Sequence, residues 1–255
     1  DIVHIQYDDW VILSNNINYP TIITSHYAYI EQPEKHGGYK NIFNNFIKND
    51  VYIYALSEGI KNTYINNGKS SDKISVVPNG VRYDLFKFKE TPEDKSIYLA
   101  KIDFRKRQYM YHEIPELYFA GNIVDNRYNK NNYLGEWSKE YLYENLTNFS
   151  NLVLLSDGEA HPLVCLEAMS AGLGLVISEY ATANLDLTKE FIDVIPKDKM
   201  DDINYINEVI KKNRTKSRTM RNEIRKYVHD NFNWEYIIES YYLKNLDKVM
   251  LWKIL

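Results

Sequence analysis

Two glutamates eight positions apart, Glu159 and Glu167, flank the point at which a helix is predicted to begin. An apolar run over residues 151–156 predicts a buried strand, Gly158 predicts a tight turn, and Pro162 is expected at the first helical position. The first turn of such a helix offers backbone N–H groups and the positive end of its dipole to an anion. This order of elements is typical of a phosphate-binding site.

The two carboxylates are predicted to meet different groups. Glu167 would lie about five residues into the helix, roughly 7–8 Å along its axis, which is close to the separation between a diphosphate and the ribose of a nucleotide. It could therefore accept hydrogen bonds from ribose hydroxyls, while Glu159 could meet a group beyond the phosphates. Two spaced glutamates alone would favour ordinary solvated charges. The strand, the proline and the Glu-Ala-Met-x-x-Gly tail favour a binding site instead.

The residues around the helix start form the predicted phosphate- and nucleotide-binding set. These residues are Gly158, Ala160, His161, Pro162, Leu163, Val164 and Glu167. The backbone N–H of His161 is a better candidate than its ring to donate a hydrogen bond to a phosphate. Cys165 is expected in the core, because it falls between two leucines of the helix.

Composition excludes several classes of protein. The 255 residues carry a net charge of −4, which gives no global attraction to nucleic acid. One cysteine allows no intrachain disulfide and favours a reducing, cytoplasmic compartment. No apolar run approaches the roughly 20 residues of a membrane span. Peripheral attachment to a membrane stays open, although no strongly basic amphipathic helix demands it.

Short apolar runs alternate with longer amphipathic stretches, which predicts an α/β fold of parallel sheets and crossover helices. Strands are predicted at residues 2–7, 21–25, 51–56, 74–77, 97–100, 117–120, 152–155, 175–178 and 192–195. Helices are predicted at residues 39–48, 57–67, 106–113, 138–146, 162–171, 201–212, 216–231 and 234–250. The charged stretch 90–95 contains Pro92 and is expected to link two α/β blocks.

Two further candidate segments follow predicted strands. His26 comes directly after the strand 21–25, and Lys101 and Lys106 follow the strand 97–100. Ligands of α/β sheets bind at the carboxyl ends of the strands. Positive groups near the predicted helix start could stabilise the charge of a leaving diphosphate. A solvated basic loop is the alternative for the two lysines.

The motif resembles the Glu-x7-Glu motif of retaining GT-B glycosyltransferases, family 4 in particular. That family has Glu-Gly-Phe-Gly-Leu-x-x-x-Glu-Ala-Met-Ala-x-Gly, and residues 159–172 here are EAHPLVCLEAMSAG. The second half matches closely, while Ala160, His161 and Pro162 replace Gly, Phe and Gly.

The likeness covers nearly the whole chain. Residues 1–6 resemble the family's Asp-Val-Val-His-x-His strand, with Gln6 in place of the second histidine. Residues 21–26 resemble the next strand, which ends in a histidine. Residues 74–81 resemble the end of the N-terminal domain, and residues 232–234 resemble the start of the terminal helix.

The resemblance implies a GT-B fold, with two Rossmann-like domains whose parallel sheets face a cleft. Residues 1–89 would form the N-terminal, acceptor-side domain, without the first strands that family members usually carry. Residues 90–232 would form the donor-binding domain. Residues 233–255 would form a helix that returns to the N-terminal domain.

The resemblance also implies an activity. The enzyme would move a hexosyl-type sugar from a UDP- or GDP-linked donor to a glycan, lipid or protein acceptor, with retention of configuration and by front-face attack. His26, Glu159 and Lys106 would be the catalytic residues. Lys101 and Lys106 match the Arg and Lys that clamp the diphosphate in the family, with lysine at the arginine position. No cofactor or metal is expected, because that family needs no divalent ion and no cluster here has metal-ligand spacing.

Two alternatives remain. A nucleotide-sugar-binding module without turnover is favoured by the changed residues of the motif and by the expected missing strands. A GT-B sugar-nucleotide epimerase ranks last, because the sequence offers no second pair of acid/base carboxylates.

Overall fold

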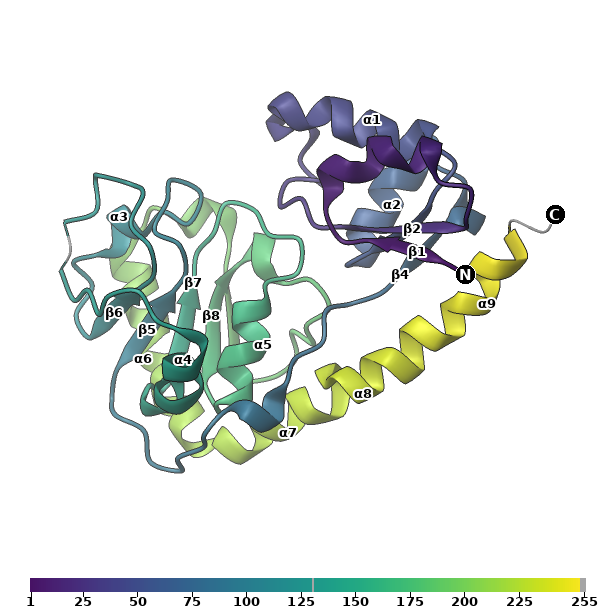
Figure 1. The fold of residues 1–255 in the computed structure, drawn as a ribbon. Coiled ribbons are helices and arrows are strands. Elements are labelled where there is room, and N and C mark those ends of the chain that lie inside the picture. Colours follow the sequence, from purple (N-terminus) through teal and green to yellow (C-terminus); the bar gives the residue numbers. More distant parts are fainter. Residues whose placement is uncertain (130, 253–255) are drawn as a thin grey trace. The chain divides into compact units, whose positions relative to one another are not determined.

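The computed structural model describes residues 1–129 and 131–252, and in this part of the chain two parallel sheets are covered by helices (Figure 1). The chain divides into two compact units. The first contains Asp1–Asn79, Glu159–His161 and the chain from Glu235 onward, and the second contains Gly80–Gly158 and Pro162–Trp234.

The first unit contains a four-stranded parallel sheet in the order β1-β2-β3-β4. Its strands are β1 (Val3–Ile5), β2 (Thr21–Ser25), β3 (Tyr52–Ala55) and β4 (Ile74–Val76). Its helices are a 3-10 helix (Asp8–Asn16), α1 (Lys40–Lys48), α2 (Glu58–Asn66), the end of α8 (Trp234–Ile237), a π-helical turn (Ile238–Tyr242) and α9 (Leu243–Trp252). Ser57 caps α2 by accepting the N–H of Ile60, as its sequence position predicts.

The two faces of this sheet pack into different apolar clusters because successive strand residues point to opposite sides. Ile53 and Ala55 of β3 join the cluster formed with α1 and α2. Tyr52 and Tyr54 join Val249 of α9 in the other cluster. The terminal helix therefore covers a sheet face that would otherwise expose large aromatic side chains (Figure 1).

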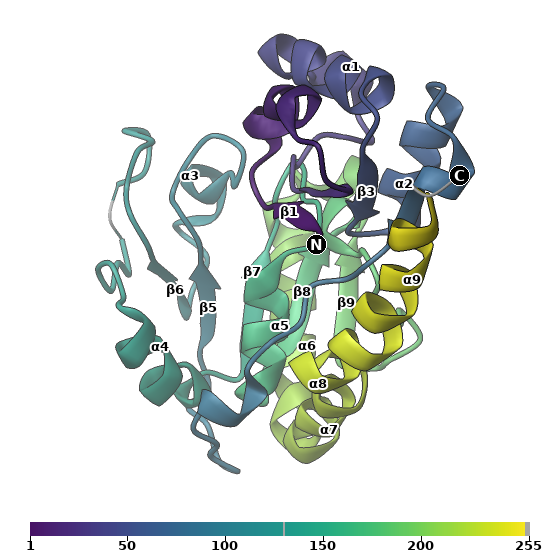
Figure 2. The same cartoon turned by 45° about the vertical axis from the view of Figure 1, so that its right-hand side comes forward.

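The second unit contains a five-stranded parallel sheet in the order β6-β5-β7-β8-β9. Its strands are β5 (Ser96–Leu99), β6 (Leu117–Ala120), β7 (Asn151–Leu154), β8 (Gly174–Ser178) and β9 (Ile192–Ile195). Its helices are α3 (Gln108–Tyr111), α4 (Lys139–Asn145), α5 (Leu163–Ser170), α6 (Ile203–Thr219) and α7 (Arg221–Phe232). Figure 2 shows α5 in front of this sheet and α6 behind it. From β5 the chain continues to β6, which pairs with one edge of β5, and then crosses over to β7, which pairs with the other edge of β5.

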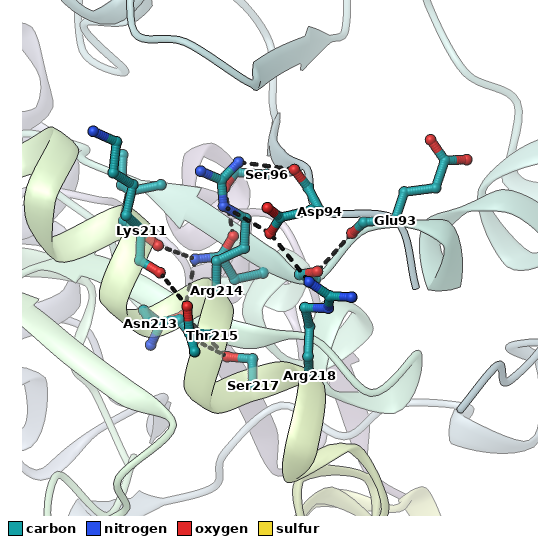
Figure 3. A network of polar contacts seen from close by, with 12 residues as sticks. Glu93, Asp94, Ser96, Lys211, Asn213, Arg214, Thr215, Ser217 and Arg218 are labelled. Atoms are coloured by element: carbon teal, nitrogen blue, oxygen red, sulfur yellow. Dashed lines mark hydrogen bonds and ion pairs between the residues drawn. The ribbon is translucent and has the colours of Figure 1, made fainter. Parts of the chain in front are cut away.

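The charged stretch before β5 lies within the second unit, where α6 binds it (Figure 3). Asp94 forms ion pairs with Arg214 at 3.5 Å and Arg218 at 3.6 Å, and its carbonyl accepts a hydrogen bond from Arg214 at 3.1 Å. The Glu93 carbonyl accepts a 2.6 Å bond from the hydroxyl of Ser150. These contacts fix the entry of the chain into the first strand of the unit.

The predicted strands are all found, with ends that differ by at most two residues. The largest difference among the helices is in the stretch 201–231, where the break falls at Met220 instead of residues 213–215. The 3-10 helix Asp8–Asn16 was not predicted, because its exposed side chains include Trp10, Ile12 and Leu13 and give no amphipathic pattern. Within the described residues, no helix combines the length and the apolar character needed to cross a bilayer.

Candidate functional site

The strand order of the second sheet creates a topological switch point between β5 and β7. The chain runs from β5 to β6 on one side and returns on the other side through β7, so the loops that follow β5 and β7 start next to each other. Open α/β sheets bind ligands at this place, beyond the carboxyl ends of the strands. The two loops carry the basic segment 101–107 and the motif segment 156–162.

Hydrogen bonds join these two loops. The Asp157 N–H donates to the Arg105 carbonyl at 2.9 Å, and the Arg105 guanidinium donates to the Gly158 carbonyl at 2.5 Å. The hydroxyl of Tyr98, on β5, donates to the Lys106 carbonyl at 2.5 Å and accepts the N–H of Leu155 at 3.0 Å. The positions of the basic segment and the motif are therefore coupled through main-chain groups.

The loop after β6 approaches the basic segment closely. Gly121 has φ +137°, and a Cβ built on it would lie 2.1 Å from the carbonyl oxygen of Ala100. Only glycine combines this conformation with so close an approach. The approach keeps the main chain at Lys101 next to the end of β6.

The helix α5 starts one residue later than predicted. Pro162 is at the N-cap position with φ −71° and ψ 108°, and Leu163 is the first helical residue. The prediction of Pro162 at the first helical position is therefore wrong. Proline provides no side-chain oxygen to cap the N–H groups of the first turn. The N–H groups of Leu163 and Val164 lie in that turn, where helical geometry provides no carbonyl partner.

Glu167 is the fifth residue of α5, as predicted, and its side chain is only 13% exposed. Its Oε1 lies 2.5 Å from the Nζ of Lys139, at the start of α4. The lysine is largely exposed, so the ion pair contributes little to stability. It does hold the carboxylate in a defined orientation.

The two predicted lysines have different surroundings. Lys106 is 7% exposed, and its N–H donates to Asp103 Oδ1 at 2.9 Å. Lys101 is exposed, and its carbonyl accepts a 3.0 Å hydrogen bond from the side chain of Gln108. The main chain of both lysines is thus held in place, whereas only the Lys106 side chain is enclosed by protein.

His161 is 5% exposed and forms two hydrogen bonds with Asn79. Its Nδ1 accepts the Asn79 N–H at 3.0 Å, and its carbonyl accepts the Asn79 side-chain amide at 3.0 Å. The ring is therefore engaged by protein, and the binding of a ligand to the backbone N–H of this residue stays a prediction. Burial lowers the pKa of the imidazole to about 4.

Acid is expected to destabilise the protein through His161. The pKa of its imidazole is about 4 in the folded chain against an ordinary value of 6.5, so between these values the unfolded chain binds more protons. The free energy of unfolding should therefore fall by about 2–3 kcal/mol as the pH drops from about 6.5 to about 4.

Urea unfolding at several pH values tests this expectation. His161→Asn is the control, because the amide oxygen could accept the same bond and does not titrate. All other groups are common to both proteins, so the difference between the two pH profiles isolates His161. Parallel profiles would show that the imidazole contributes nothing to the pH dependence.

His26 follows β2, at the carboxyl edge of the first sheet. It borders a hollow of about 470 Å³ lined by Gln6, Tyr7, Asp8, Asp9, His26, Tyr27 and Tyr39. Asp8 accepts the N–H of His26 at 3.0 Å, the N–H of Tyr27 at 3.2 Å and the Tyr39 hydroxyl at 2.7 Å. Burial raises the pKa of the Asp8 carboxyl, while desolvation lowers the pKa of His26 and the Asp8 charge opposes that effect.

Three residues that shape the two loops and the hollow beside His26 were not predicted from the sequence. Asp8 follows the first strand just as His26 follows the second, so the shared sheet edge could have revealed it. Arg105 lies within the basic segment, but spacing alone favoured its lysine neighbours. Asn79 lies in a turn that the sequence predicts, but its bond with His161 could not be predicted, because the two residues are 82 positions apart.

Other predicted residues have buried or partly buried positions. Cys165 is buried in the apolar core of the second unit, as expected. Ala160 is buried in the apolar cluster of the first unit, and Glu159 next to it is partly exposed. Residues 1–129 and 131–252 contain no group of three or more His, Cys, Asp or Glu side chains arranged to hold a metal ion.

The sequence matches no protein-family model, and it matches no curated protein. Solved structures do resemble it. HepE from Anabaena in complex with UDP-glucose has a TM-score of 0.75 at 15% identity, with 94% of this chain and 77% of that chain covered. Sucrose-phosphate synthase from Thermosynechococcus elongatus has a TM-score of 0.73 at 18% identity, with 94% and 71% covered.

A third similar structure is the lipopolysaccharide outer core galactosyltransferase WaaB in its apo form. Its TM-score is 0.67 at 19% identity, and 99% of this chain and 75% of that chain are covered. At these identities the likeness concerns the fold. In this chain the fold consists of two parallel α/β units, a switch point in the second unit, and a terminal helix packed on the first sheet. The chain therefore has the fold of the GT-B glycosyltransferases.

Proposed function

We propose that this chain is a retaining glycosyltransferase similar to family 4, which moves a hexosyl group from a UDP- or GDP-linked sugar to a glycan, lipid or protein acceptor. The observation that carries the proposal is the switch point of the second sheet, where the basic segment and the Glu-x7-Glu loop are hydrogen-bonded together in front of α5. HepE, of the same fold, was crystallised with UDP and with UDP-glucose, which supports a nucleotide-sugar donor.

The proposed donor site uses three kinds of group. The N–H groups at the start of α5 and the backbone of residues 158–161 bind the diphosphate, which also meets the positive end of the helix dipole. Lys101 and Lys106 supply positive charge. The Glu167 carboxylate accepts hydrogen bonds from the ribose hydroxyls, and its ion pair with Lys139 keeps the carboxylate oriented.

The proposed reaction is a front-face substitution without a metal ion. The bond between the anomeric carbon and the diphosphate oxygen breaks, and its electron pair stays on the phosphate. The acceptor oxygen bonds to the same face of the sugar, and its proton passes to the departing phosphate oxygen. Lys106 stabilises the charge that develops on the phosphate, because preorganised cations act most strongly where charge appears. Glu159 and His26 stabilise and orient the sugar.

Removal of the Glu167 carboxylate is expected to weaken nucleotide binding. Glu167→Ala should raise the Kd of the preferred nucleotide, UDP or GDP, about 10–100-fold, because it loses charge-assisted hydrogen bonds of about 1.5–3 kcal/mol. Isothermal titration with both nucleotides measures this. Glu144→Ala is the control, since that exposed carboxylate on α4 pairs only loosely with Lys87, at 3.8 Å. Absence of binding to the wild type, or equal binding by Glu167→Ala, would contradict the proposed site.

Turnover separates this proposal from a module that binds nucleotide sugars without reaction. Hydrolysis of the bound sugar nucleotide in the absence of an acceptor is the measurement. Steady turnover that requires Glu159 supports transfer chemistry. Tight binding of nucleotide with no turnover of any UDP- or GDP-sugar would favour the binding module.

A further inference from the structure

We propose that Asn79 and His161 are positioning residues that hold the Glu159 loop for reaction with the donor sugar. This inference rests on the proposed function, because it assigns Glu159 a place beside the sugar. It assigns a role to Asn79, which does not touch the donor, and to the side chain of His161, which bonds to Asn79 while its backbone belongs to the proposed diphosphate site. Their effect acts through the main chain of the loop.

The contact between the two residues is specific on both sides. His161 uses its ring Nδ1 and its main-chain carbonyl as acceptors, and Asn79 uses its N–H and its side-chain amide as donors. Both distances are 3.0 Å, and the histidine is 5% exposed. Two hydrogen bonds between the same two residues fix the orientation as well as the position of the loop at His161.

The anchor is close to Glu159 along the chain. Glu159 is two residues before His161, and Ala160 between them is 7% exposed within the apolar cluster of the first unit. On the other side, the Gly158 carbonyl accepts a 2.5 Å hydrogen bond from Arg105. Gly158 is thus anchored within the second unit and His161 within the first, and the His161 anchor limits the positions that the Glu159 carboxylate can reach relative to the first unit.

The partner residue is itself in a rigid setting. Asn79 lies between Pro78 and Gly80, and a Cβ on Gly80 would lie 2.7 Å from the ring of Trp234. Proline restricts the backbone of its own residue, and the close packing at Gly80 restricts the next one. Asn79 therefore offers its donors from a fixed position, as preorganisation of a site requires.

The effect is expected on the reaction more than on nucleotide binding. UDP and GDP meet the loop only through the backbone of residues 158–161 and lack the sugar that Glu159 would meet, so in a variant with a loosened loop the Kd of the nucleotide should rise by a smaller factor than kcat falls. The kcat for hydrolysis of the corresponding sugar nucleotide should fall at least tenfold, because a displacement of about 1 Å in a site is costly to reaction.

Four variants of the full chain test the inference. Asn79→Ala removes the amide donor, and His161→Phe keeps a ring without the Nδ1 acceptor. His161→Asn restores an acceptor near the Nδ1 position and should recover most of the activity. Asn49→Ala is the matched control, because that half-buried amide also donates to a carbonyl, of Val11 at 3.1 Å, outside the site. All four are assayed at a temperature well below their Tm.

Kinetics and hydrogen exchange together decide the outcome. The inference holds if Asn79→Ala and His161→Phe lose kcat and speed amide exchange in residues 158–165, while Asn49→Ala does neither. It fails if either variant keeps wild-type kcat, or if Asn49→Ala loses as much. If the wild type turns over no sugar nucleotide, the proposed function fails. Amide exchange in the loop then still tests the anchor, and unchanged protection in Asn79→Ala would overturn it.

Discussion

Lys106→Met should lower the turnover of the preferred sugar nucleotide by about 10²–10³-fold, the usual cost of removing one preorganised group that stabilises charge in the transition state. Methionine keeps a long flexible chain in a site that is only 7% exposed, so the variant loses the charge with little loss of packing. The Kd of the nucleotide should rise less than kcat falls, because the charge on the phosphate grows as the glycosidic bond breaks.

Lys69→Met is the matched control for this experiment. Lys69 is also buried, at 4% exposed, and its ammonium donates to the carbonyls of Phe46 and Asn49, both at 3.0 Å. Its loss should lower the Tm without changing turnover per folded molecule. Wild-type kcat in Lys106→Met would remove this lysine from the mechanism. An equal loss of kcat in both variants would show that the effect comes from instability.

Of the proposed variants, Arg221→Lys is expected to cause the largest decrease in the free energy of unfolding. The Arg221 guanidinium is 2% exposed and donates to the carbonyls of Lys89, Phe149, Thr147 and Ala171 and to the Thr147 hydroxyl, at 2.6–3.0 Å. Burial lowers its pKa to about 10, so it stays charged at neutral pH. An ammonium cannot reproduce this planar set of donors, so several buried carbonyls would lose their partner.

The expected cost is about 3–5 kcal/mol, as for breaking other buried charged networks. This corresponds to a fall in Tm of roughly 6–20 °C for a chain of this size. Arg218→Lys is the control, since Arg218 is 46% exposed and pairs with Asp94 at 3.6 Å, and its change should stay within about 0.5 kcal/mol. Thermal unfolding of both variants measures the difference. Similar Tm values would show that the Arg221 contacts add little to stability.

Most of the secondary structure could be predicted, because it depends on local patterns. The buried strands are short apolar runs, and β7 followed by the motif and α5 was visible from Leu152 to Ala171 alone. The place of Glu167 in its helix followed from helical rise and periodicity. The start of α5 was displaced by one residue, because Pro162 adopts an extended ψ of 108° as N-cap.

Contacts between distant residues could not be predicted from local patterns. The ion pair of Glu167 with Lys139 and the bonds of His161 with Asn79 join residues 28 and 82 positions apart. Nothing in the residue types alone selects these partners. Arg105 is similar, since its side chain reaches a carbonyl 53 positions along the chain. The roles assigned to the site residues stay predictions until the variants are measured.

Local sequence patterns are enough to predict the α/β class, the strands and the helix that carries Glu167, because the periodicity of apolar residues and the turn residues act over a few positions. The place of β5 between β6 and β7, which determines the loops that meet in front of α5, is visible only in the folded chain. Strand order depends on which arrangement of sheet edges and helix faces buries the most apolar surface. The total buried area depends on residues from the whole unit. The basic segment and the motif are neighbours for this reason.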